Sequence, residues 1–304
     1  MKNTILCVVE LDNSPDEVVA RAAWLAKLFD SDLELVLSEP KTNYFGESFI
    51  YFAEMQVLAD SIQNEQDAIL QRLASSAEGA GITVRTSIST ERPEANMIVR
   101  KAESCGANFV VKGTHYHSPS ERASLAHTDW QLIRKLERPL WFVKPIEWKE
   151  KSVVVAAVDP IHSHDKTASL DREIIRSGQK IVEKCGGKLQ LFHTYQRLEE
   201  IGSRVTWRIK PEIMVIDKLD EKIQKEHRDA LDSLAADFAI DAKAVHQLPG
   251  RTHELLPTFA RANGASLVVM GALARSAIQQ RILGSTAARV LDHLPCDVLI
   301  VHAQ

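Results

Sequence analysis

The sequence predicts an α/β protein made of two tandem, doubly wound domains, each a five-stranded parallel sheet flanked by helices (Rossmann-like). Apolar runs typical of buried strands alternate along the chain with segments whose apolar residues recur at helical spacing. The chain also repeats itself, because ANFVVKG at 107–113 matches ASLVVMG at 265–271, a shift of 158 residues, which is the difference between 113 and 271. We therefore predict one domain at 1–146 and a second at 151–304.

The first half begins with a buried-type strand, TILCVVEL at 4–11. Ser14, Pro15 and Glu17 follow, and they predict a helix start in which Ser14 caps, Pro15 occupies the first turn and Glu17 completes a capping box. The elements expected after this helix are strand 33–37, helix 55–79, strand 82–88, helix 93–105, strand 108–113, helix 127–137 and strand 140–144.

The second half repeats this order. Its expected strands are 152–159, 188–195, 242–248, 266–271 and 297–302, and its expected helices are 168–185, 217–239, 253–262 and 285–293. In doubly wound sheets, ligands bind outside the carboxyl ends of the strands, so the loops that follow strands are the places to look for a site.

The last strand of each half would leave an open apolar edge, which proteins rarely leave bare. We therefore expect 141–144 and 298–302 to pair antiparallel as an intramolecular pseudo-dimer, and a homodimer is possible in addition.

Composition narrows the function classes. Among 304 residues, 45% are hydrophobic, the net charge is −4, and no dense Lys/Arg run appears, so we expect no nucleic-acid partner. No apolar stretch is long enough to span a membrane. The four cysteines are scattered without metal-type pairing, as in a reducing cytoplasm, and we expect a cytoplasmic protein. The pairs His115/His117 and His162/His164 lack a third ligand, so no metal site is predicted.

The stretch GALARSAIQQRILGST, residues 271–286, combines strand end, glycine turn and helix start. Gly271 ends a strand, and Ser285 and Thr286 begin the next helix, where free backbone N–H groups favour an anion. A phosphate cradle is one interpretation. The other is that Gly284 only makes the turn and Ser285 only caps the helix.

The element order, Asp159 at the end of a strand, and the spacing Gly271-x2-Ala274-x9-Gly284-Ser285 resemble the tandem, two-domain type of the universal stress protein family. Nucleotide-binding members of that family carry G-x2-G-x9-G-S/T. The resemblance implies a stress-response protein with ATP or AMP, accompanied by Mg²⁺, in the second half. It places adenine or ribose near Asp159 and phosphates on Gly271, Gly284, Ser285 and Thr286.

One position of the loop departs from the family pattern. Ala274 stands where the second glycine is expected, and its methyl group crowds the phosphate path if the position needs positive φ. Arg275, next in sequence, offers a compensating contact to a phosphate. The sequence therefore predicts a partial nucleotide site.

The first half has lost more of the same motif. Its equivalent reads Gly113-x2-Tyr116-x9-Ala126-His127-Thr128, and Glu10 stands where the strand-ending Asp is expected. We interpret this half as a degenerate domain without a phosphate cradle. Accordingly, Gly113→Ala is expected to leave nucleotide binding unchanged, whereas Gly284→Val is expected to abolish it.

Other functions remain open. Apolar stripes on two helices would normally be core, but they could instead line a cavity for an apolar or amphipathic small molecule; they comprise Met55, Leu58, Ile62 and Leu70, then Ile223, Ala230, Leu231, Leu234 and Phe238. A protein-interaction scaffold is a further alternative. No catalytic constellation stands out, so an enzyme is not predicted, although slow nucleotide hydrolysis is compatible with the resemblance.

Overall fold

The computed structural model describes residues 3–38, 53–89, 91, 94–114, 128–148, 151–161, 165–197, 213–272 and 290–303. The chain forms two compact units, Met1–Ile146 and Glu147–Gln304. They are called here the first and the second unit.

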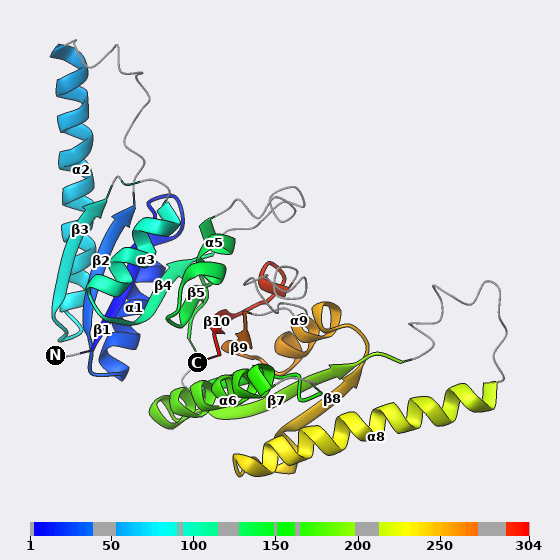
Figure 1. The fold of residues 1–304 in the computed structure, drawn as a ribbon. Coiled ribbons are helices and arrows are strands. Elements are labelled where there is room, and N and C mark those ends of the chain that lie inside the picture. Colours follow the sequence, from blue (N-terminus) through cyan, green and yellow to red (C-terminus); the bar gives the residue numbers. More distant parts are fainter. Residues whose placement is uncertain are drawn as a thin grey trace, which may run out of the picture. The chain divides into compact units, whose positions relative to one another are not determined.

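The first unit is a parallel sheet with strand order β3-β2-β1-β4-β5 (Figure 1). Its elements in chain order are β1 (Thr4–Val9), α1 (Pro15–Leu28), β2 (Asp32–Ser38), α2 (Ala53–Glu78), β3 (Val84–Ser89), α3 (Glu94–Ser104), β4 (Ala107–Gly113), α5 (Thr128–Lys135) and β5 (Leu140–Val143).

The second unit repeats this arrangement with strand order β10-β9-β6-β7-β8, again parallel. Its elements are β6 (Val153–Ala157), α6 (Asp165–Cys185), β7 (Lys188–Tyr195), α8 (Ile213–Asp237), a 3-10 turn η2 (Ala242–Ala244), β8 (Val245–Pro249), α9 (Thr252–Ala262), β9 (Leu267–Gly271) and β10 (Asp297–Val301). The predicted fold class is confirmed. The predicted pairing of 141–144 with 298–302 stays a prediction.

The central strands are continuous apolar runs because helices cover both faces of each sheet. All six residues of β1 are buried, and four of the five in β6 are buried. Such runs are typical of parallel strands, since an exposed face would alternate with polar residues. On α1 five apolar side chains that recur at helical spacing are buried, namely Val18, Val19, Ala22, Leu25 and Ala26, while Phe29 follows the helix and its ring packs at a tilt on that of Phe109.

The predicted capping box at the start of α1 is wrong. Ser14 does precede the helix, and Pro15 occupies its first turn, but the Ser14 side chain makes no capping hydrogen bond. The reason is the backbone: Ser14 has φ 47° and ψ 55°, a left-handed conformation, whereas a side-chain cap needs extended backbone. The preceding turn, in which Asn13 bonds to Glu10 through both its backbone and its side chain, leads the chain into this conformation.

The predicted strand 242–248 is wrong in its first three residues. Residues Ala242–Ala244 form a 3-10 turn, because the Asp241 carboxylate accepts a hydrogen bond from the Lys243 backbone N–H at 2.7 Å. Aspartate side chains compete in this way with the sheet ladder, so β8 begins only at Val245.

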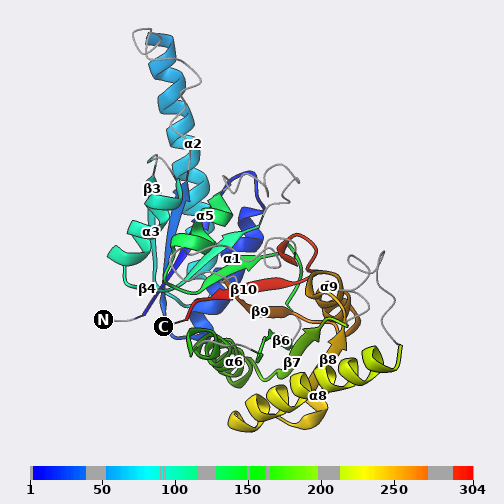
Figure 2. The ribbon, with the colours of Figure 1, turned by 45° about the vertical axis from the view of Figure 1, so that its right-hand side comes forward.

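Helices α2 and α8 pack through their carboxyl-terminal halves. Leu70 on α2 and Leu231 on α8 are buried, but Leu58 is 42% exposed. The apolar stripes predicted on these two helices are therefore only partly buried in the core. Five of their residues are half-buried, namely Ile62, Ile223, Ala230, Leu234 and Phe238. The amino-terminal turns of both helices extend past the sheet of their own unit, so none of the described strands faces them (Figures 1 and 2). The side chain of Met55 lies outside the described residues.

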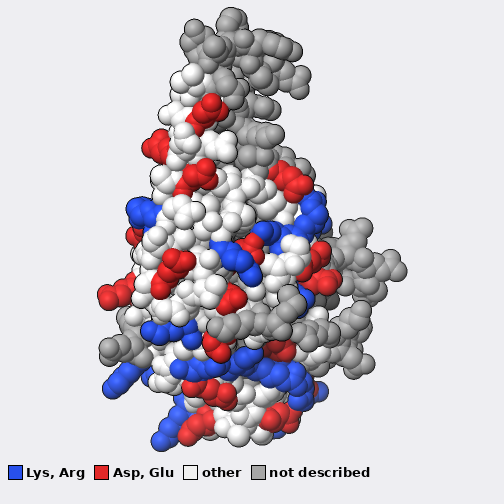
Figure 3. All heavy atoms as spheres, turned by 90° about the vertical axis from the view of Figure 1, so that its left-hand side faces the viewer, with Lys and Arg blue, Asp and Glu red and all other residues white. Residues whose placement is uncertain are grey.

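Acidic and basic side chains both occur across the face drawn in Figure 3. On α8, acidic and basic side chains form pairs one turn apart, such as Lys225 with Asp229 at 2.6 Å and Arg228 with Asp232 at 2.7 Å. Among the described helices, none combines the length and the apolar character that crossing a bilayer requires.

Candidate functional site

The sheet registers place Glu10 and Asp159 at equivalent positions in the two units. Cys7 of β1 pairs with Val111 of β4, and Ala156 of β6 pairs with Val269 of β9. Val111 and Val269 are related by the repeat shift of 158 residues, and Glu10 and Asp159 each lie three residues further along. Both carboxylates therefore emerge at the carboxyl end of the first strand of their unit, where doubly wound sheets bind ligands.

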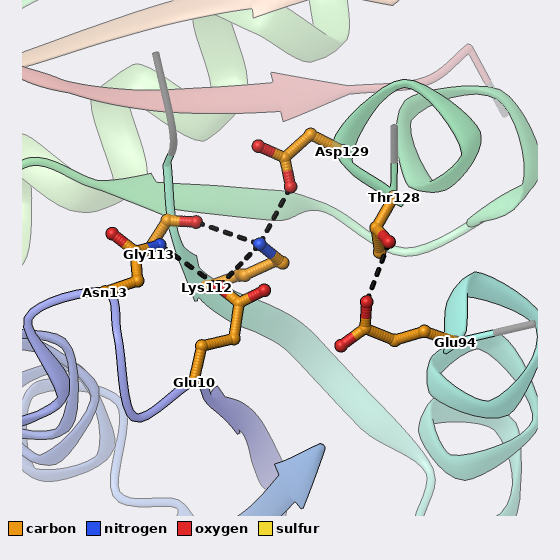
Figure 4. A network of polar contacts seen from close by, with 7 residues as sticks. All are labelled: Glu10, Asn13, Glu94, Lys112, Gly113, Thr128 and Asp129. Atoms are coloured by element: carbon orange, nitrogen blue, oxygen red, sulfur yellow. Dashed lines mark hydrogen bonds and ion pairs between the residues drawn. The ribbon is translucent and has the colours of Figure 1, made fainter. Parts of the chain in front are cut away.

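In the first unit this end of the sheet holds a buried charge cluster around Lys112 (Figure 4). The Lys112 ammonium lies 2.9 Å from Oδ1 of Asp129 and 2.7 Å from Oε2 of Glu10. It also donates a hydrogen bond to the Gly113 carbonyl at 3.2 Å. Lys112 and Asp129 are fully buried, and Glu10 is 12% exposed. We name Glu10, Lys112 and Asp129 the lysine cluster.

The electrostatics of the lysine cluster keep it charged. Burial alone would lower the pKa of the Lys112 ammonium, but the adjacent charges of Asp129 and Glu10 and their hydrogen bonds raise that pKa above its ordinary value. Asp129 also lies in the first turn of α5, where a negative charge is favoured by the helix dipole. The carboxylate of Asp129 thus lies at the helix start, where a phosphate would be expected to bind.

A second carboxylate lies at the start of the same helix. The Thr128 hydroxyl donates to Oε2 of Glu94 at 2.7 Å, which links α5 to the first residue of α3 (Figure 4). Thr128 corresponds to Thr286 of the predicted phosphate loop. In the first unit, therefore, the hydroxyl at the helix start already has an anionic partner within the protein.

The second unit lacks the charges of the lysine cluster. The repeat shift puts Met270 in place of Lys112, Ala287 in place of Asp129 and Thr252 in place of Glu94. Met270 is buried, and the Thr252 hydroxyl pairs with the Thr194 hydroxyl at 2.6 Å. The fourth position is that of Glu10, where the second unit has Asp159. It is the one position of the four that carries a carboxylate in the second unit.

Asp159 follows β6 and is partly exposed, at 34% of its side chain. Its backbone N–H donates to Oδ1 of Asp171 on α6 at 3.1 Å, which fixes the turn after the strand. Its Oδ1 lies 3.9 Å from Nδ1 of His193 on β7. The predicted role of Asp159 toward adenine or ribose stays a prediction.

Gly271, the last residue of β9, lies against α6. A Cβ atom added there would be 2.5 Å from Cδ2 and 3.0 Å from Cγ of Leu170. The absence of a side chain is therefore required by helix-to-strand packing, whatever Gly271 does toward a phosphate. The corresponding Gly113 is equally close to its neighbours, because a Cβ there would lie 2.5 Å from Nδ2 of Asn13. Gly113→Ala is thus expected to crowd Asn13, whereas its predicted lack of effect on nucleotide binding stays a prediction.

The rest of the predicted phosphate loop lies outside the described residues, namely Ala274, Arg275, Gly284, Ser285 and Thr286, and so do its first-half counterparts Tyr116, Ala126 and His127. The histidine pairs His115/His117 and His162/His164 lie outside them as well. In the part of the chain that is described, no three His, Cys, Asp or Glu side chains gather as ligands for a metal ion.

Comparison with known proteins decides the family. Residues 1–144 and 154–302 each match the universal stress protein family. The chain belongs to the universal stress protein family. It is 24% identical over 303 residues to universal stress protein E of Escherichia coli (strain K12), covering 99% of this chain and 94% of that protein.

Two crystal structures of universal stress proteins resemble the whole chain. A putative one from Pseudomonas aeruginosa UCBPP-PA14 matches with a TM-score of 0.71 and 22% identity, over 99% of this chain and 93% of that one. One from Archaeoglobus fulgidus DSM 4304 matches with a TM-score of 0.65 and 15% identity, over the full length of both. These likenesses concern the fold, and they confirm the tandem universal stress protein architecture.

Sequence reasoning missed Lys112 and Asp129. The signal was present: a lysine near the end of the apolar strand ANFVVKG needs a buried counter-charge, because an unpaired ammonium is costly in a core. The aspartate of HTDW, at a helix start next to the end of that strand, was the natural candidate. His193 was also missed, and it was read only as part of a strand.

Proposed function

We propose that this universal stress protein is a non-catalytic, cytoplasmic stress-response regulator that binds one adenine nucleotide, ATP or AMP, at the carboxyl end of the second unit's sheet. Asp159 would contact adenine or ribose. Gly284, Ser285 and Thr286 would hold the phosphates at a helix start, with Arg275 as an additional donor and Mg²⁺ accompanying the nucleotide.

The observation that carries this proposal is the contrast between the two units. In the first unit, the place at the helix start where a phosphate would bind is occupied by the lysine cluster and by the hydrogen bond between Thr128 and Glu94. A phosphate there would meet two or three carboxylates at short range, and like charges repel strongly where burial lowers the dielectric response. In the second unit the positions equivalent to Lys112, Asp129 and Glu94 hold Met270, Ala287 and Thr252, and only Asp159 keeps a carboxylate. An anion at the helix start would therefore meet fewer carboxylates in the second unit than in the first.

Calorimetry with ATP tests the proposal. The parent protein should bind one ATP per chain, and Gly284→Val should weaken binding by about 100-fold or more, because a branched side chain displaces hydrogen bonds to a charged phosphate worth roughly 1.5–3 kcal/mol each. Ala126→Val is the matched control, since Ala126 is the first-unit counterpart of Gly284. It should bind ATP as the parent does.

Two results would count against this function. Absence of heat from the parent at millimolar ATP would exclude the nucleotide. Equal loss in Gly284→Val and Ala126→Val would show that the first unit takes part in binding.

A second candidate, a scaffold or a binder of an apolar small molecule, is favoured by the projecting turns of α2 and α8. Val57 is 68% exposed, Leu58 42% and Leu219 44%. By contrast, a first-unit pocket of about 360 Å³ at the amino ends of the strands is lined mainly by polar groups such as Glu34, Arg85 and Lys101, which suits no apolar ligand. Mass spectrometry of co-purifying small molecules separates the two functions, because it identifies either a nucleotide or an apolar compound.

A further inference from the structure

A pair of hydrogen-bonded histidines lies beside the proposed ligand site of the second unit. Nε2 of His193, on β7, is 2.7 Å from Nδ1 of His227, on α8, and the rings stack with centroids 5.0 Å apart. His193 is buried. The sheet registers put Leu37 at the equivalent position of the first unit, because Phe192 and Val36 pair with the equivalent residues Ala157 and Val8. The fold itself therefore does not require a histidine there.

The hydrogen bonds fix where the protons are. Nδ1 of His193 is 3.0 Å from the Val158 carbonyl, which only accepts, so Nδ1 of His193 must carry a hydrogen. In the neutral ring Nε2 is then an acceptor, and His227 must donate to it from Nδ1. A positive His193 ring would donate from both nitrogens, and His227 would accept. The pair can hold its contact in either charge state.

The residue after Val158 is Asp159, so His193 is bonded to the same turn that carries the proposed ligand contact. Oδ1 of Asp159 lies 3.9 Å from Nδ1 of His193. The other groups facing the pair are Asp171 of α6, bonded to the Asp159 N–H, and Tyr195 of β7, whose ring lies 5.7 Å from that of His227.

Burial lowers the pKa of His193 below its ordinary value, and His227 lowers it further, whereas the Val158 carbonyl, Asp159 and Asp171 act in the opposite direction. His193 is therefore neutral near neutral pH, and its ring takes up a proton only at lower pH.

We propose that the His193–His227 pair is a proton-responsive support for Asp159: the neutral pair holds the Val158–Asp159 turn for ligand, and the protonated pair draws the Asp159 carboxylate toward His193. His193 is thus a positioning residue. The consequence for nucleotide affinity rests on the proposed function, but the coupling between the pair and Asp159 does not.

The sign of the effect follows from linkage. Above the pKa of the pair Asp159 is held for the ligand. As the pH falls through that pKa, the positive ring and the ligand compete for the same carboxylate, so affinity decreases. The same linkage requires the protonated pair to release a proton when nucleotide binds.

The first experiment uses no ligand. A histidine NMR titration of the full chain should show the pair taking up its proton below pH 6.5, and Asp159→Asn should lower the apparent pKa of the pair by about one unit, since it removes an opposite charge at about 4 Å. His246, which is half-buried, contacts the Phe259 ring and has a pKa lowered by partial burial and by the charge of Arg228, is the internal control and should not respond to Asp159→Asn. An unchanged pKa of the pair in Asp159→Asn would overturn the proposal.

The second experiment measures ATP affinity between about pH 7.5 and pH 5 in the parent, in His193→Asn and in His246→Asn. His193→Asn keeps an N–H donor for the Val158 carbonyl but cannot take up a proton. The parent and His246→Asn should lose about tenfold more affinity on acidification than His193→Asn, as a one-unit pKa shift corresponds to a factor of ten. The charge of ATP also changes with pH, but it does so equally for all three proteins, so this effect cancels when their pH profiles are compared. Identical pH profiles in the parent and His193→Asn would overturn the proposal.

Failure of the proposed function looks different. If the parent binds no ATP at any pH, the nucleotide assignment is wrong, and the response of the pair to Asp159→Asn still decides the inference.

Discussion

Lys112→Met is expected to destabilise the first unit by about 3–5 kcal/mol, the range for removing one partner of a buried ion pair. Methionine is the residue at the equivalent position 270 of the second unit, so its shape is compatible with the fold. Its effect comes from charge, because the buried carboxylates of Asp129 and Glu10 lose the ammonium that lies within 3 Å of both. Urea unfolding, followed by a first-unit probe such as the fluorescence of buried Trp130 or Trp141, measures the loss.

Two companion variants separate charge from packing. Lys112→Met combined with Asp129→Ala recreates the second unit's residues at both positions, and it should recover much of the lost free energy because it no longer leaves that carboxylate buried alone. Arg72→Met removes the cation of an exposed pair with Asp16, in which both side chains are more than half exposed, and should cost under about 1 kcal/mol. If Lys112→Met unfolds at the same urea concentration as the parent, the lysine cluster is not a buried charge network.

The lysine cluster makes the two units differ in charge at the start of the last helix. A duplicated domain that kept its ligand site would keep space and a positive or neutral environment at the helix start. The first unit instead places its own carboxylate there and neutralises it with its own lysine. The first unit thus holds the counter-charge of this carboxylate within the protein, whereas the second unit has no such internal pair at the equivalent positions.

The order of strands and helices could be predicted because it depends on the spacing of apolar residues along the chain. Burial of one face of each element in the core requires that spacing. Continuous apolar runs became central strands such as β1, and a repeat of 158 residues maps α3 onto α9 residue by residue. Local hydrogen bonds were harder to predict. Ser14 has the right residue type for a cap, but the turn at Glu10 and Asn13 decides its backbone conformation.

The candidate site was predictable where a motif marks it and not where residues meet only in space. Asp159 follows β6 and Gly271 ends β9, as the sequence predicted, while their roles toward a ligand stay predictions. Lys112 and Asp129 lie 17 positions apart, on a strand and a helix, and His193 and His227 lie 34 positions apart. Neither pair has a spacing that by itself signals contact, although a lysine in an apolar strand indicates that a buried counter-charge is needed.

The role of Gly271 can be divided between packing and ligand binding. Gly271→Ala should destabilise the second unit by about 1–3 kcal/mol, the usual cost of overpacking, because the new methyl group would lie 2.5 Å from Leu170. Leu170→Ala removes that neighbour. In a double-mutant cycle the two substitutions should therefore be non-additive, the double variant being more stable than the sum of the single losses predicts, with a coupling of about 1–3 kcal/mol.

ATP affinity in the same cycle then shows what else Gly271 does. If Gly271 acts only through α6, affinity should return together with stability in the double variant. If a phosphate approaches the backbone at Gly271, as the glycine motif implies, affinity should stay about tenfold or more below that of Leu170→Ala alone, because the methyl group remains in the path of the phosphate. We expect the second result. Gly178→Ala is the matched control, since its Cβ would lie 2.7 Å from Leu189: it should destabilise α6 packing to a similar extent and leave ATP affinity unchanged. Full recovery of affinity in the Gly271→Ala, Leu170→Ala variant would remove Gly271 from the ligand site and leave it a packing residue.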